Sequence, residues 1–443
     1  MPSLRPVGRD SRSALGNPWV QLLLGVVCMA AVASMQYGWT QFVDPLDARF
    51  HWGRANIQVA FTIFVALETW LVPVEGYLVD RFGPRPVVLV GALLVASAWS
   101  LNSAAASLPV LYVAAAIGGT GTGAVYGTCV GNALKWFPGR RGLAAGLTAA
   151  GFGVGAAFTN APIANMIQTA GYQHAFLFFG VLQGSIVLIV AGGLRIAPAA
   201  YLQAAPQRSQ SPLSFTPAQV LRQPLFWLNY LMFVLVAAGG LVMTASVAPL
   251  ARDLKVAKVP VDLFGLVIAA GVYALILQRI FDGIGRPFFG WVSDAIGREH
   301  TMAIAFTIGA LALLTLTGAG TSPTVFVLAT AVYFGAFGEI YSLFPAMQGD
   351  TFGARYAAAN AGMLYTAKGA ASLLVSPATR LAAVSGWHTV FAIAVTCNLV
   401  AAALGLFVVK PMRARHFARL KAAVVAGATA NADTAALPRT ARD

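Results

Sequence analysis

The chain has 443 residues, of which 58% are hydrophobic and only 10% are charged. Because a soluble domain carries roughly 25% charged residues, this composition excludes an ordinary soluble protein and indicates an integral membrane protein. The formal net charge of +14 does not indicate a nucleic-acid partner, since the basic residues are not combined with aromatic residues into a binding surface. We expect them to contact the lipid bilayer instead.

Hydrophobic stretches of about 20 residues, long enough to cross a bilayer as helices, recur along the whole chain. They predict twelve transmembrane helices, at 19–43, 56–79, 87–106, 109–134, 143–168, 175–196, 225–250, 264–290, 302–320, 324–348, 357–381 and 388–409. A polar segment rich in Pro, Gln and Ser follows the sixth stretch and is typical of a linker. The expected fold class is therefore all-α integral membrane, with two six-helix bundles.

The linker divides the sequence into five predicted parts. They are a cytoplasmic N-terminal segment (1–18), an N-terminal bundle (19–196), a cytoplasmic linker (197–224), a C-terminal bundle (225–409) and a cytoplasmic tail (410–443). The first apolar stretch is too long for a signal peptide and lacks a cleavage site of small residues, so we expect it to be retained.

Lysine and arginine residues predict the orientation, because basic loops stay in the cytoplasm. On the side that we assign to the cytoplasm they are Arg5, Arg9, Arg12, Arg81, Arg85, Lys135, Arg140, Arg141, Arg208, Arg222, Lys410, Arg413, Arg415, Arg419 and Lys421. Fewer lie on the opposite side. We therefore expect a monomeric, multi-pass protein of the inner (cytoplasmic) cell membrane with both termini in the cytoplasm.

A short motif occurs twice, once in each half. The sequence GYLVDRFGPR at 76–85 returns in degenerate form as GWVSDAIGR at 290–298. The first glycine allows two helices to approach closely, the aspartate can lie at the N-terminus of a neighbouring helix, and the second glycine permits a tight turn. We predict a conformational latch formed by Gly76, Asp80, Arg81, Gly83, Arg85, Gly290, Asp294, Gly297 and Arg298.

The repeated motif resembles the characteristic motif of the major facilitator superfamily. In that superfamily each half is a six-helix bundle, the substrate site lies between the halves near the midplane, and the halves rock to expose it alternately. Further segments, GNPW, MQYGWT, DRFGPRP, GYQHAFLFFG, GRPFFGWVSDAIGRE, FGEIYSLFPA and YTAKGA, resemble the oxalate/formate antiporter family, which is close to the monocarboxylate transporters. This resemblance implies small carboxylate anions as partners.

Two cations lie inside hydrophobic stretches, Arg286 in the eighth and Lys368 in the eleventh. A cation at the centre of a membrane helix costs about 2.5–3.5 kcal/mol, so we expect these two to bind an anion. Arg286 precedes Asp294 by eight residues, which places it about 12 Å deep at 1.5 Å per residue. Lys368 lies at a similar depth. Arginine can bind one carboxylate with two hydrogen bonds, and lysine can meet another as a point charge.

The resemblance assigns the same two residues to the carboxylate site. It also implies an acidic or amide residue four positions before the arginine, which is Asp282 here. The alternative for Asp282 and Arg286 is an ion pair within one helix that only neutralises charge, and the alternative for Lys368 is snorkelling to the membrane interface. Arg279 shares the helix face of both residues and is placed to guide the anion inward.

Aromatic residues are expected to line the cavity. The resemblance points to Gln36, Tyr37, Tyr126, Phe337 and Tyr341, and each aromatic among them has the alternative of ordinary helix packing. Phe337 and Phe152 stand where the oxalate exchanger is expected to have a tryptophan and a tyrosine. Those differences count against strict oxalate specificity.

The charges predict exchange of small carboxylates, because an empty site with two like charges resists closing until an anion neutralises it. The alternative is proton-coupled monocarboxylate symport, in which Asp282 takes up a proton with the substrate. Glu68, Glu75 and Glu339 are further candidates for a proton relay, and Glu75, near the latch, has the alternative of a structural partner for a basic loop residue. A carboxylate sensor and a transporter of other substrates, drugs included, are further possibilities.

Motifs of catalysis do not occur in the sequence. It contains no nucleotide-binding loop, metal-ligand cluster or activated nucleophile. We therefore expect neither an enzyme nor an ATP-driven pump, and no catalytic residue, metal or cofactor.

Overall fold

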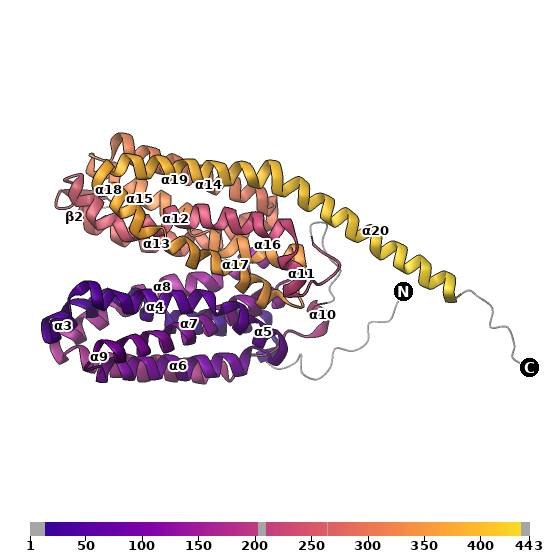
Figure 1. Cartoon of the computed structure of the whole chain (residues 1–443), viewed down its shortest axis with the longest axis horizontal. Helices are drawn as coiled ribbons and strands as arrows, with labels where there is room; N and C mark the ends of the chain where they lie inside the picture. The colour runs from indigo at the N-terminus through magenta and orange to yellow at the C-terminus, as the bar shows by residue number, and fades with distance from the viewer. Residues whose placement is uncertain (1–13, 203–209, 264, 436–443) are drawn as a thin grey trace, which may run out of the picture.

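A computed structural model describes residues 14–202, 210–263 and 265–435. The predictions that rest on Arg5, Arg9, Arg12 and Arg208 lie outside these residues. The helices form two layers that lie side by side, the first half of the chain in one layer and the second half in the other (Figure 1). We call the end that carries the linker helices α10 (Ala199–Leu202) and α11 (Pro217–Leu221) the linker end, and the opposite end the far end.

The N-terminal half contains broken and unbroken helices. After the short 3-10 turn η2 (Ala14–Gly16), its helices are α1 (Pro18–Val32), α2 (Ser34–Tyr37), α3 (Thr40–Phe50), α4 (Arg54–Trp70), α5 (Val72–Phe82), α6 (Pro84–Ala104), α7 (Leu108–Trp136), α8 (Arg141–Ala170) and α9 (Tyr172–Ala191). Asn17 caps the N-terminus of helix α1, because its side chain accepts a hydrogen bond from the Trp19 amide. Helices α4 and α5 meet at a 42° bend, next to Pro73, which cannot donate a helical hydrogen bond.

The C-terminal half repeats this plan. Its elements are α12 (Pro224–Asp253), β1 (Pro260–Leu263), β2 (Leu266–Ala269), α13 (Ala270–Ile296), α14 (Arg298–Ala319), α15 (Pro323–Phe337), α16 (Ile340–Phe352), α17 (Ala357–Ser372), α18 (Val375–Ser385), α19 (Trp387–Ala403), the π-helical η3 (Leu404–Val409) and α20 (Lys410–Ala435). The eighth helix was predicted to begin at 264, but α13 begins only at Ala270, after two antiparallel strands, β1 and β2, in which Val261 pairs with Ile268. Helix α20 continues well past the bundle at the linker end (Figure 1).

The apolar character of the helices agrees with membrane insertion. In the described part of the chain nine helices are long and apolar enough to cross a bilayer, or ten if α4 and α5 form one span. Helix α13 is not among them, and it carries four charged side chains. Helix α17 is not among them either, because it has only 16 residues before its break. These two helices carry Arg286 and Lys368.

The two halves touch through closely packed backbones. A methyl group added to Gly76 on α5 would lie 2.6 Å from the carbonyl carbon of Ala358 on α17. Gly142 on α8 and Gly290 on α13 approach each other in the same way. Glycine at these positions lets the helices approach to backbone contact, as small residues do in other membrane helix pairs.

Candidate functional site

Arg286 lies in the middle of α13, on the face that meets α8, and is 2% exposed. Its Nη2 donates to Oδ2 of Asp282, one turn earlier, at 2.6 Å. Its Nη1 donates to the carbonyl oxygen of Ala149 in the other half at 2.8 Å, and its guanidinium carbon lies 4.6 Å from the ring centre of Tyr341. Among the described residues, Nε of Arg286 and Oδ1 of Asp282 have no hydrogen-bond partner. The ion pair within one helix is therefore present, and it retains unused donor and acceptor atoms.

Lys368 on α17 is 3% exposed and pairs with the other half of the molecule. Its Nζ donates to both carboxylate oxygens of Glu68 on α4, at 3.1 Å each. It also donates to the hydroxyl of Tyr365 at 2.9 Å, and that hydroxyl donates to Oε1 of Glu68 at 3.3 Å. The ammonium group thus does not snorkel in this conformation, because an acidic side chain from the opposite half holds it in the interior.

A chain of aromatic rings runs between the two cations and across the interface of the halves. Tyr341 lies 6.4 Å from Tyr365, and Tyr365 stacks on Tyr126 of α7 at 4.6 Å between ring centres. Phe152 of α8 contacts Tyr126 and Tyr37 edge-on, each at 5.4 Å. Aromatic faces attract cations, so these rings suit the surroundings of Arg286 and Lys368.

The remaining predicted residues lie around this chain of rings. The guanidinium carbon of Arg279 lies 4.5 Å from the ring centre of Tyr37, on the far-end side of Arg286. Phe337 contacts Tyr341 at 5.9 Å, without a described contact to either cation. Gln36 is buried, and its side-chain oxygen has no partner within the described part of the chain.

Two members of the site were not assigned to it from the sequence. Tyr365 precedes Lys368 by three residues and so shares its helix face, a spacing that would have revealed it. Glu68, an acid in an apolar stretch, was predicted only as a candidate for a proton relay, without a partner. Its pairing with Lys368 follows from how α4 and α17 meet, which no local pattern contains.

The four buried charges of the site sum to zero. Arg286 and Lys368 contribute two positive charges, and Asp282 and Glu68 contribute two negative charges. The sequence-based expectation that the empty site holds two uncompensated cations is therefore wrong for this conformation. Paired charges of this kind tolerate burial, whereas a single unpaired one does not.

The repeated motif forms matching contacts in the two halves. Asp80 of α5 is paired with Lys135 and accepts from the Ala359 amide, in the first turn of α17, at 2.9 Å. Asp294 of α13 accepts from the amides of Gly142 and Leu143, in the first turn of α8, at 3.0 and 2.9 Å. Each aspartate therefore lies at the N-terminus of a helix in the opposite half, where the helix dipole favours a negative charge.

The other members of the predicted latch divide into two groups. Gly83 and Gly297 have φ of +88° and +97° at the turns that follow α5 and α13, a conformation that glycine adopts without strain. Arg298 pairs with Asp294 at 2.6 Å. Arg81 and Arg85 are exposed and make no hydrogen bond or ion pair with the opposite half within the described chain.

A buried carboxylate that the sequence did not indicate joins the halves at the linker end. Asp350 of α16 accepts from Arg141 of α8 at 2.8 Å and from Arg298 of α14 at 3.0 Å. Gln210 of the linker donates to it at 3.1 Å. Asp350 follows a long apolar stretch, so sequence alone marks it only as a helix end. These bonds, together with those of the two motif aspartates, join the two halves at the linker end.

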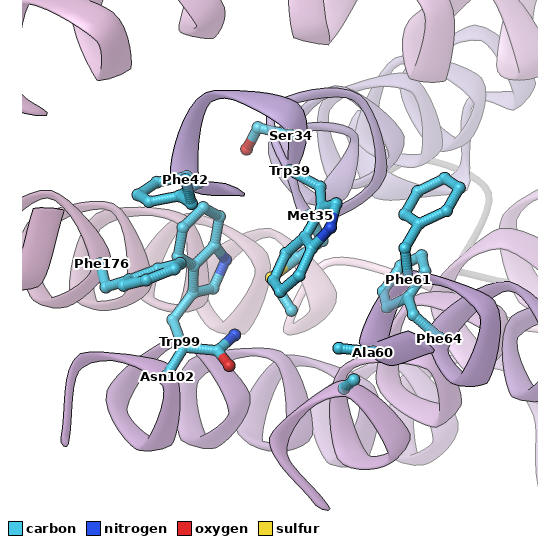
Figure 2. Close-up of a pocket in the computed structure, with 11 residues that line it drawn as sticks. Ser34, Met35, Trp39, Phe42, Ala60, Phe61, Phe64, Trp99, Asn102 and Phe176 are labelled. Carbon is cyan, nitrogen blue, oxygen red and sulfur yellow. The ribbon is translucent and has the colours of Figure 1, made fainter. Parts of the chain in front are cut away.

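A separate small pocket lies within the N-terminal half (Figure 2). Aromatic rings dominate its wall, among them Trp39, Phe42, Phe64 and Trp99. Its internal space of about 10 Å³ is close to that of one water molecule. Its lining contains no charged residue, so it does not suit a carboxylate.

Two helical halves with paired charges buried at their shared interface define a membrane transporter. Residues 22–282 match the Major Facilitator Superfamily. The chain belongs to this superfamily, whose members are transporters and not enzymes.

Its relatives include transporters of named substrates. The oxalate:formate antiporter of Oxalobacter formigenes is 34% identical over 411 residues, which cover 92% of this chain and 95% of the antiporter. Monocarboxylate transporter 13 of Bos taurus is 25% identical over 344 residues, which cover 75% of this chain and 76% of that protein. The crystal structure of the E. coli fucose:proton symporter has a TM-score of 0.64 at 16% identity, covering 88% of this chain and 98% of the symporter. The similarity to that structure shows the all-α fold of the superfamily.

Proposed function

We propose that the protein exchanges small carboxylates of the oxalate and formate type across the inner cell membrane by alternating access. The similarity to the oxalate:formate antiporter supports this substrate class. The proposal assigns substrate binding to Arg286 and Lys368, with Tyr341, Tyr126, Tyr37 and the other predicted residues as the wall of the site.

The observation that carries the proposal is that each buried cation already holds a carboxylate. Arg286 binds that of Asp282 and Lys368 binds both oxygens of Glu68. A substrate carboxylate can take the place of either group without new geometry, since charge-assisted bonds of the same length would form. Tyr365 would then donate to the substrate instead of Glu68.

The contacts between the halves support alternating access. The ion pairs and backbone contacts of the linker end close one side of the site, and they are separate polar bonds that can break together when the halves rock. The clustered lysines and arginines at that end favour its assignment to the cytoplasm, with both termini on the same side.

A second candidate is proton-coupled carboxylate symport, and the neutral site favours it. Obligatory exchange would follow if the empty site held two unpaired cations. Because Asp282 and Glu68 neutralise them, the empty protein can close and return without an anion. A proton would then have to neutralise the carboxylate that the substrate displaces.

Transport into proteoliposomes tests the proposal. Arg286→Gln and Lys368→Gln should each abolish uptake of labelled oxalate and formate. The matched controls Arg252→Gln and Lys258→Gln change exposed residues outside the site and should transport like the wild type. Folded Arg286→Gln or Lys368→Gln protein with normal uptake would remove that residue from the site.

Vesicle loading separates the two candidates. Uptake that requires internal carboxylate and ignores a pH gradient supports exchange, whereas uptake into empty vesicles driven by external acid supports symport.

A further inference from the structure

We infer that Glu68 is a tethered counter-ion that competes with the substrate carboxylate for Lys368 and takes up one proton when the substrate displaces it. The inference rests on the second candidate of the proposed function, proton-coupled carboxylate symport, and deepens it. It assigns proton coupling to Glu68, on α4, rather than to Asp282, the candidate that the sequence favoured.

The geometry gives Glu68 the position of a bound substrate. Both of its carboxylate oxygens lie 3.1 Å from Nζ of Lys368, and Tyr365 completes the site by contacting both partners. Glu68 belongs to the N-terminal half, and Lys368 to the C-terminal half. Their bond therefore joins the halves across the plane where a transported anion must pass.

Glu68 and Asp282 differ in whether each carboxylate keeps its cation when a substrate arrives. Asp282 lies one turn from Arg286 on the same helix, so the two groups stay together whichever way the halves move. Glu68 is 0% exposed, and Lys368 is the only cation that pairs with it in the described part of the molecule. When Lys368 turns to a substrate, Glu68 becomes a buried charge without a partner, and protonation removes that charge.

The groups that face Glu68 offer no second cation. The charged group that interacts with Glu75 of α5 is Glu68, so a second acid, and not a cation, lies near the first. The titratable residues on the helices packed against α4 are Lys368 and Tyr365 of α17, Tyr112, Tyr126, Cys129 and Lys135 of α7, Glu75, Tyr77, Asp80 and Arg81 of α5, Tyr37 of α2, and Asp44, Asp47 and Arg49 of α3. Of the cations other than Lys368, Lys135 is paired with Asp80, and Arg49 and Arg81 are exposed.

The charge balance of one cycle follows from these contacts. A monocarboxylate binds to Lys368, and one proton from the same side of the membrane converts the Glu68 carboxylate to the neutral acid. After the halves rock, the substrate leaves, the proton is released to the other side, and Glu68 pairs with Lys368 again. The site thus keeps zero net charge at each closed stage, with or without substrate.

Transport by the full-length protein in proteoliposomes tests the inference. The measured quantity is the ratio of lactate uptake into lactate-loaded vesicles to lactate uptake into empty vesicles. An internal pH dye follows proton uptake at the same time. The signal of protein-free vesicles is subtracted from both. Glu68→Gln leaves Lys368 without a counter-ion, so the ratio should rise by roughly tenfold or more and the proton signal should be lost. Oxalate should also compete better against lactate in this variant.

Two controls make the result specific. Glu339→Gln is the same change at another fully buried glutamate that makes no described ion pair, and it should keep the wild-type ratio and proton signal. Glu68→Asp keeps the charge and should restore both signals in part. An unchanged ratio and proton signal in Glu68→Gln, or their loss only in Asp282→Asn, would overturn the inference.

A measurement on the wild type does not depend on a variant folding. Titration of purified protein with lactate in buffers of different ionisation enthalpy should show uptake of about one proton per bound lactate, and binding without proton uptake would overturn the inference. Absence of any carboxylate uptake by the wild type would instead overturn the proposed function, and the inference with it.

Discussion

Replacing Asp350 with Asn should open the linker end of the molecule. The Asp350 side chain is 4% exposed and that of Arg141 is 5% exposed, so their 2.8 Å bond between the halves is buried. The substitution leaves the Arg141 guanidinium without its anion as long as the linker end stays closed. In the open state the same group reaches water.

The surroundings of Asp350 determine how much free energy the Asp350→Asn substitution costs the closed state. Removing one partner of a buried ion pair costs about 3–5 kcal/mol. The lower value applies here, because Arg298 keeps its bond to Asp294 at 2.6 Å and Arg141 keeps a carbonyl contact at 3.4 Å. Since 1.4 kcal/mol corresponds to a factor of ten, a penalty of about 3 kcal/mol on the closed state shifts the equilibrium toward opening by roughly 100-fold.

Distances between spin labels on the two halves can measure this shift. Labels at the exposed positions Gly139 and Arg355 should show a longer distance population in Asp350→Asn. The control Asp44→Asn removes an exposed ion pair, Asp44 with Arg54, which is worth only about 0–1 kcal/mol, and should leave the distribution unchanged. An unchanged distribution in Asp350→Asn would refute the reasoning that this carboxylate holds the linker end closed.

Three further predictions concern other contacts. Gly76→Ala places a methyl group 2.6 Å from the α17 backbone, so it should prevent closure of the linker end and abolish transport. Gly318→Ala, with open space around it, should transport normally. Equal uptake rates in the two variants would contradict this prediction. Tyr365→Phe removes the hydroxyl that accepts a hydrogen bond from the Lys368 ammonium group. Such a bond is worth about 1.5–3 kcal/mol, so KM for oxalate should rise at least roughly tenfold. An unchanged KM would exclude Tyr365 from the site. Arg413→Gln removes the 2.6 Å bond to Glu299 and should release α20 from the bundle. Trypsin should then cleave the segment beyond residue 410 faster than in the wild type. Wild-type protection of that segment would show that other contacts hold the helix.

The helices, the two buried cations and the repeated motif could be predicted from the sequence because the bilayer restricts which residues a membrane helix can contain. Membrane helices must be long and apolar, so their approximate positions and the two unusual cations are visible without a structure. The repeated motif is visible because glycine and aspartate are required at fixed spacing. The short hairpin before α13 was not visible, since the strand LVIA is as apolar as the helix that follows it.

The pairing of charges depends on tertiary structure and was not visible. Glu68 and Lys368 are 300 positions apart, and Asp350 and Arg141 are 209 positions apart. No local pattern relates such residues, because their contact is decided by how the two halves dock. Asp282 and Arg286, four positions apart in one helix, could be paired from the sequence for the opposite reason.

An experimental structure with oxalate bound would show whether Arg286 and Lys368 bind the substrate together. We expect oxalate oxygens within about 3 Å of both Nζ of Lys368 and the guanidinium of Arg286, with Glu68 no longer bonded to Lys368. Oxalate bound elsewhere, while the bond between Glu68 and Lys368 stays intact, would contradict this expectation.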